Sequence, residues 1–151
     1  MINMSVLNTA VAELLTNSPT IQLLNGVVER STMINADPAV CPWIGVYPAP
    51  NLHTVARAAV AKSWTTNGGI QVVVQSANLS ESGTAASDEL EELIQAVQLV
   101  LNTDLPLSQA GTGIRITEFS REYSYVLFDE GGSGGLFMPQ AIITALFEAR
   151  S

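Results

Sequence analysis

One segment, residues 70–101, constrains the fold of this chain more than any other. It opens with Ile70–Gln75, a β-branched and mostly alternating run that predicts a strand with one well-buried face. After a polar turn over Asn78–Ala86, apolar residues recur at the spacing of one helical stripe: Leu90, Leu93, Ile94, Val97 and Leu101. Burial of each such side chain is worth roughly 1.5–3 kcal/mol before entropy is subtracted. We therefore expect this strand and helix to form the core.

The composition indicates one domain that assembles with other subunits. A chain of 151 residues is too short for two independent cores, so we expect a single domain over residues 1–151. Hydrophobic residues make up 47% of the chain and charged residues only 13%, which leaves little charge to cover the surface of a monomer. The net charge of −8, with six lysines and arginines, argues against direct binding of nucleic acid.

Cysteine and histidine are too few for a disulfide or a zinc cluster, because Cys41 and His53 are single occurrences. We interpret Cys41 as a small buried apolar residue and His53 as an exposed loop residue. No basic region precedes a long apolar block, and no window approaches 18 apolar residues, so no membrane association is expected. The default compartment is the cytosol.

Two short helices are predicted near the N-terminus. Ser5 is the expected cap of a helix over Val6–Leu15, where apolar residues follow helical spacing. Ser18-Pro19 predicts the start of a second helix, and Asn25-Gly26 predicts its end. Val27–Ile34 is expected to be extended or irregular.

A hairpin is predicted in the first half of the chain. Trp43–Tyr47 is expected to be a strand bounded by prolines. Thr66–Gly69 is a strong turn signal, so we pair a strand around Val55–Trp64 with one at Ile70–Ser76, although the alanines of Val55–Trp64 also suit a helix.

The second half is expected to be rich in strands. Ile114–Phe119 alternates as a strand does, and Tyr123–Phe128 either continues it or forms a neighbour. Gly131–Gly135 is predicted as a flexible tip. A last strand is favoured for Leu136–Arg150, with a helix over Ala141–Ala149 as the alternative. The predicted fold class is α+β, a mostly antiparallel sheet with helices packed on one face.

No residue pattern predicts catalysis, a metal or a cofactor. Asp88, Glu89, Glu91 and Glu92 are expected in the first turns of the central helix, where the helix dipole stabilises carboxylates. Gly111-Thr112-Gly113 and Gly131–Gly135 lack the residues that complete a phosphate loop. We therefore expect a protein that is not an enzyme.

Association with other subunits remains as the expected activity. Arg57, Arg115 and Arg121 lie in strand-like segments among Glu118 and Glu122, where alternating signs on a strand face can pair across subunits. A solvated face with weak salt bridges is an equal alternative.

The order of these elements resembles that of the tail terminator, or tail completion, proteins of long-tailed bacteriophages. The resemblance covers nearly the whole chain: an N-terminal helix, strand Trp43–Tyr47, a long hairpin, the unit Ile70–Leu101, strand Ile114–Phe119 and an alternating C-terminal strand. It implies a hexameric ring that caps the tail tube, stops its growth and meets the head connector. It also implies synthesis in the host cytoplasm, a place at the head-proximal end of the virion tail, and no enzymatic site.

The same resemblance suggests which residues form contacts. The family uses segments like Pro50–Gly68 and the glycine-rich tip at ring or tube contacts, so Asn67, Gly68, Gly132 and Gly134 join the three arginines as candidates. Two alternatives remain open: another head-tail connector or tail-tube subunit, and a small-ligand-binding α+β domain.

Overall fold

The computed structural model describes residues 3–30, 35, 40–48, 55–58, 64–76, 84–103, 113–128 and 136–150. These residues form a mostly antiparallel six-stranded sheet with three helices, so the predicted α+β class is confirmed. Along the chain the elements are α1 (Met4–Thr16), α2 (Pro19–Leu23), β1 (Val27–Arg30), β2 (Trp43–Pro48), β3 (Val55–Ala58), β4 (Trp64–Gln75), α3 (Thr84–Thr103), β5 (Gly113–Phe128) and β6 (Leu136–Arg150).

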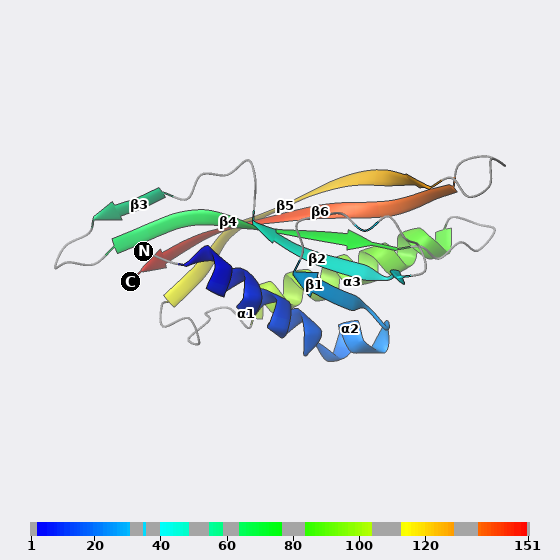
Figure 1. Ribbon diagram of the computed structural model, residues 1–151, viewed down its shortest axis with the longest axis horizontal. Coiled ribbons are helices and arrows are strands. Elements are labelled where there is room, and N and C mark those ends of the chain that lie inside the picture. The colour runs from blue at the N-terminus through cyan, green and yellow to red at the C-terminus, as the bar shows by residue number, and fades with distance from the viewer. Residues whose placement is uncertain are drawn as a thin grey trace.

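The strands are arranged in the order β1-β2-β4-β6-β5, with β3 also paired to β4 (Figure 1). Only β1 and β2 run parallel, while the other pairs are antiparallel. The helices cover one face of the sheet. Figure 1 shows an elongated molecule in which β3 and the start of β4 extend toward the end where both termini lie.

The first helix begins earlier than expected. Asn3, not Ser5, is the N-cap of α1, and its side-chain oxygen accepts hydrogen bonds from the backbone N–H of Ser5 at 3.0 Å and Val6 at 3.3 Å. Asparagine and serine are similarly favourable at the N-cap position. Because Asn3 comes first in the chain, the helix begins after Asn3. The hydroxyl of Ser5 instead accepts a hydrogen bond from Arg30 at 2.9 Å.

The second helix has the predicted limits. Ser18 is its N-cap and Pro19 its first residue. It ends at Leu23 with Leu24 as its C-cap, after which Asn25 lies in the left-handed region at φ 57° and the N–H of Gly26 donates to the carbonyl of Ile21 at 3.0 Å. Asparagine tolerates this backbone conformation, which closes the helix end without glycine there.

The central helix α3 is confirmed, and its apolar stripe is buried as predicted. Leu90, Leu93, Ile94, Val97 and Leu101 are each no more than 3% exposed. The prediction that the acidic run begins in the first turn of this helix is wrong, because α3 starts at Thr84 and has no acidic residue in its first turn. The dipole acts mainly within that turn. Glu89 accepts a hydrogen bond from the Ser76 hydroxyl at 2.7 Å and Glu91 pairs with Arg121 at 3.2 Å, whereas Asp88 and Glu92 are exposed.

One continuous core lies between the helices and the sheet. It is formed by side chains from α1, α2, α3 and the covered sheet face, among them Leu7, Val11, Leu15, Ile21, Ile44, Val46, Ile70, Val72, Val74, Leu93, Ile94, Ile143 and Phe147. The other face carries a smaller buried cluster of Trp43, Tyr47 and Val73. The rings of Trp43 and Tyr47 both lie close over Gly45, which leaves no space there for a side chain.

The predicted turn at Thr66–Gly69 is wrong. These residues lie inside β4, and β3 pairs with the first part of that strand, with Val55 opposite Asn67 and Ala58 opposite Trp64. The hairpin therefore exists, but its connection comprises residues 59–63, which lie outside the described residues. On its other side β4 pairs with β6 without interruption from Thr65 to Gln75, and these ladder bonds outweigh the local preference for a turn.

The two longest strands are in the C-terminal third. β5 runs through both predicted segments as one strand of 16 residues, with a bulge between Ile116 and Glu118. β6 confirms the C-terminal strand, and the helix alternative for Ala141–Ala149 is wrong, because buried and half-buried residues alternate along it. The predicted tip Gly131–Gly135 lies outside the described residues.

Candidate functional site

The long strand β5 forms one edge of the sheet. Among the described residues it pairs with β6 alone, so the backbone groups on its other side have no strand partner there. Its side chains from Arg115 to Tyr123 are mostly exposed, including Glu118, Arg121 and Glu122. Long uncovered edges are unusual in native proteins, because they can pair with strands of another molecule. This strand is the most extended candidate contact surface of the described chain.

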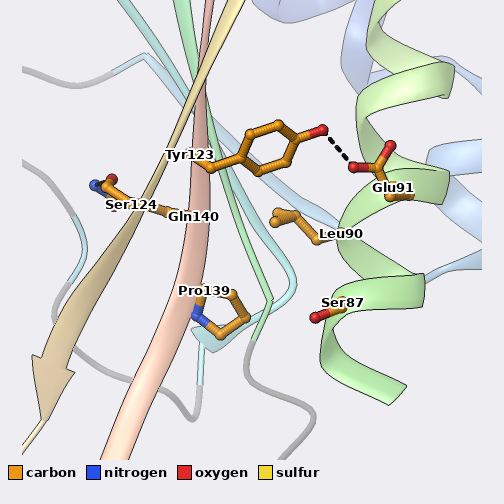
Figure 2. A pocket seen from close by; sticks show the side chains of 7 residues that line it. All are labelled: Ser87, Leu90, Glu91, Tyr123, Ser124, Pro139 and Gln140. Atoms are coloured by element: carbon orange, nitrogen blue, oxygen red, sulfur yellow. Dashed lines mark hydrogen bonds between the residues drawn. The ribbon is translucent and has the colours of Figure 1, made fainter. Parts of the chain in front are cut away.

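A small polar cluster ties β5 to the central helix. Arg121 forms a salt bridge with Glu91 of α3 at 3.2 Å and donates a hydrogen bond to the hydroxyl of Tyr123 at 3.3 Å. The Tyr123 hydroxyl in turn donates to the other carboxylate oxygen of Glu91 (Figure 2). All three side chains are at least partly exposed, so the cluster fixes the position of the edge strand at a modest gain in stability.

A pocket of about 200 Å³ lies beside this cluster, between α3 and the last two strands. It is lined by residues from both sides: Ser87, Leu90, Glu91, Tyr123, Ser124, Pro139 and Gln140. Figure 2 shows the ring of Tyr123 reaching from its strand toward the helix, with Leu90 facing the space between them. Leu90 is buried, whereas Ser87 and Tyr123 are exposed at the rim. The pocket therefore combines apolar walls with a carboxylate.

A row of buried amides crosses the helix-free face near the same end of the sheet. The Gln75 amide donates to the carbonyl of Asn35 and to the side chain of Gln140, both at 3.0 Å, and Gln140 donates to Ser124 at 2.8 Å. Gln75 is fully buried, and its side-chain oxygen has no hydrogen-bond partner among the described residues. The row links β4, β6 and β5, because Gln140 accepts a hydrogen bond from Gln75 and donates one to Ser124.

Three of the predicted contact residues share one face. Asn67 lies opposite Glu148 of β6, and Arg115 lies on the other side of Glu148, so these residues form one row across the sheet. Arg57 of β3 lies two residues after Val55, the residue opposite Asn67. It therefore lies on the same helix-free face of the sheet. Arg57, Asn67 and Arg115 are all exposed, as a contact surface requires.

The other predicted contact residues are placed differently. Arg121 lies on the helix-facing side of the sheet and pairs with Glu91 within the chain, so it does not share a face with Arg57 and Arg115. The bulge before Glu118 shifts the alternation of β5, which explains why Arg115 and Arg121 face opposite ways. Gly68 is half-buried inside β4, while Gly132 and Gly134 lie outside the described residues.

Of the two residues considered for chemistry, Cys41 lies among the described residues. Cys41 is half-buried rather than buried, and its thiol contacts the sulfur of Met138 at 3.3 Å. His53 lies outside the described residues. Within the described ranges no group of three metal-binding side chains occurs, and no helix is long and apolar enough to cross a membrane.

Sequence reasoning missed the residues that line the pocket. Glu91 was considered only as part of an acidic run, and Tyr123 only as a strand residue. They are 32 residues apart in sequence and meet because β5 folds back beside α3. One local signal pointed to this cluster: Arg121 and Tyr123 are two residues apart, and this spacing places both side chains on the same face of a strand.

No known family model matches this chain, and no curated protein matches it in sequence.

Proposed function

We propose that this chain is a structural subunit of a long-tailed bacteriophage that forms a ring, caps the tail tube and presents a surface to the head connector. Its partners are then further copies of itself, the tail tube protein and the connector protein, and the chain acts without catalysis. It would be made in the host cytoplasm and reside at the head-proximal end of the tail.

The observation that carries this proposal is the edge strand β5. Among the described residues β5 has a strand partner on one side alone, and it carries the exposed charges Arg115, Glu118 and Glu122, which is a surface suited to another protein. The low share of charged residues, 13%, supports the same conclusion. The tail assignment rests on the resemblance in the order of elements along the sequence.

The ligand-binding alternative has less support. The pocket between α3 and β5 has about 200 Å³, whereas pockets for small molecules usually have roughly 300–1,000 Å³. A pocket of this size accepts one side chain of a partner more readily than a metabolite. A connector or tail-tube subunit remains the nearer alternative, because such subunits also form rings.

Native mass spectrometry of the purified chain, alone and with tail tubes of the same virus, tests the proposal. We expect a closed oligomer, hexameric by the resemblance, and electron microscopy should show it at one end of each tube. Tubes grown with the chain present should stop lengthening, while tubes grown without it continue. A protein that binds neither itself nor tubes contradicts the proposal, and one that lines the whole tube favours the tail-tube alternative.

Arg115→Glu is a variant matched to this test, because it reverses an exposed charge of the β5 edge without touching the core. We expect a normal thermal midpoint with weaker assembly. Glu13→Lys, an exposed charge reversal on α1, is the control and should assemble as the unchanged chain does.

A further inference from the structure

The two border strands of the sheet differ in sequence, and each has an open side. Among the described residues β1 pairs with β2 alone and β5 pairs with β6 alone, and Figure 1 shows these neighbours side by side. The N–H of Val27 donates to the carbonyl of Pro42 at 2.9 Å, just before β2, so the N–H of Val28 points to the open side of β1. Each copy therefore has two unlike edges that can accept a further strand.

The direction of the strands determines how these two edges can meet. β1 runs antiparallel to β5 within the chain, because β1 and β2 are parallel and the next three pairs across the sheet are antiparallel. A second copy that continues the sheet keeps the direction of its strands and the side of its helices. Its β1 then lies antiparallel to β5 of the first copy, with helix-facing residues opposite helix-facing residues.

We propose that β1 of one copy adds to the open edge of β5 of a second copy, with Val28 opposite Ile116 and Glu29 opposite Arg115. This contact rests on the proposed assembly of the chain into a ring and specifies where one subunit holds the next. It joins two different surfaces, and such heterologous contacts close into a ring when the rotation between neighbours allows it. In the closed ring neither border strand keeps an open edge.

This register matches side chains on both faces of the sheet. On the helix-facing side, Val28 and Ile116 are half-buried at opposite borders of the same core, so pairing them removes more apolar surface from water. On the helix-free side, Glu29 and Arg115 are exposed and of opposite charge, and Arg115 forms no ion pair with another described residue. The Glu29 carboxylate accepts the indole N–H of Trp43 at 3.1 Å, and a carboxylate can accept further donors.

Other antiparallel registers that keep the faces aligned oppose like charges. The unshifted continuation of the sheet places Glu29 opposite Glu122. It also places Arg30 opposite Arg121. An intermediate shift places Glu29 opposite Glu118. Like charges in directly opposed positions destabilise a strand pair, so charge selects the register that brings Glu29 to an arginine.

The register also sets the stagger between neighbouring copies. Across the sheet Glu29 lies in the row of Val73 of β4, whereas Arg115 lies in the row of Asn67. Val73 comes six residues after Asn67, which corresponds to about 20 Å along the strands. A constant stagger closes into a cylinder when the strands tilt relative to its axis.

Cysteine cross-linking tests the register directly. Opposed residues of an antiparallel pair have Cα atoms about 4.5–5.5 Å apart, which is within the reach of a disulfide. The variant carries Glu29→Cys and Arg115→Cys, with Cys41→Ala so that the native thiol does not react. At concentrations where native mass spectrometry detects oligomers of the unchanged chain, we expect oxidised glutathione to link copies into multimers that a reductant separates.

Two features make this cross-link specific. Within one chain β2, β4 and β6 lie between the two positions, a separation of about 19 Å, so the disulfide cannot form internally. The matched control carries Glu29→Cys with Glu122→Cys in the same Cys41→Ala background. It reports the unshifted register and should not cross-link.

A charge swap tests the ion pair without a covalent link. Glu29→Arg and Arg115→Glu should each weaken association about 5-fold, the effect of about 1 kcal/mol for a reversed strand pair. The double variant restores opposite charges and should associate within about two-fold of the unchanged chain, because the two positions are coupled. Glu29→Arg also removes an acceptor for Trp43, so thermal melts of each variant establish that folding is retained.

The outcomes distinguish this contact from the ring itself. A ring in which the Glu29→Cys and Arg115→Cys pair links no more than the control pair, or in which the two charge reversals add, overturns the contact and leaves the ring proposal standing. Cross-linked chains that remain open support the contact and contradict the ring. A protein that stays monomeric up to about 1 mM, where even weak complexes form, overturns both.

Discussion

Two leucines of α3 allow a matched test of the core. Leu93 is fully buried against the sheet, whereas Leu99 of the same helix is 60% exposed. Leu93→Ala removes buried methyl groups and leaves a cavity, which costs about 2–5 kcal/mol in comparable cores. For a domain of this size each kcal/mol lowers the thermal midpoint by about 2–4 °C, so a cost near 3.5 kcal/mol predicts a loss of roughly 7–14 °C.

Leu99→Ala carries out the same chemical change at a residue that is 60% exposed. Its effect should stay within about 0.5 kcal/mol, or less than roughly 2 °C. Circular dichroism melts and urea titrations of both variants provide the measurement, and an unchanged urea slope shows that stability alone has changed. Leu93→Asp goes further and should prevent folding, because it buries an unpaired carboxylate. Equal midpoints for Leu93→Ala and Leu99→Ala, or a soluble Leu93→Asp with an unchanged midpoint, would refute the packing of α3.

Three further predictions follow from the sheet. Gly45→Ala should destabilise the fold by about 1–3 kcal/mol, because the new methyl group overlaps the ring of Trp43, and the near-ultraviolet circular dichroism of that ring should change. Gln140→Met keeps the volume but removes the acceptor for Gln75, and should lower stability in urea by about 1–3 kcal/mol. Arg121→Ala removes an exposed ion pair with α3 and should lower stability by at most about 1 kcal/mol in the same titration.

The helices and most strands could be predicted from the sequence because their patterns are local. The apolar residues of α3 recur with the helical period, and in a strand they would lie on both faces. The residues of β6 alternate between buried and half-buried from Ala141 to Ala149, as expected for a strand. Ser18-Pro19 marks a helix start by its own chemistry. Each of these signals depends on neighbours within one turn or one pleat, so the rest of the fold cannot easily override it.

The turn at Thr66–Gly69 and the contacts of Arg121 could not be predicted in the same way. Asn67 and Gly68 favour a turn in isolation, but β6 offers this segment a continuous partner. The side of the sheet that Arg121 occupies depends on a bulge several residues earlier in β5, which no sequence signal indicated. The pocket residues come together only through the packing of α3 on the sheet. At these positions tertiary pairing thus outweighed local preference.

The open edge of β5 also limits how the chain can aggregate. If two copies of β5 met antiparallel about a two-fold axis, a register centred on Ser120 would place Glu118 opposite Glu122. Registers centred on Arg121 or on Glu122 would place that residue opposite itself. Like charges in directly opposed positions destabilise a strand pair, so the edge disfavours these pairings with its own copy. The same side chains that make β5 available to a partner of different sequence therefore disfavour two-fold dimers of the unassembled chain through this edge.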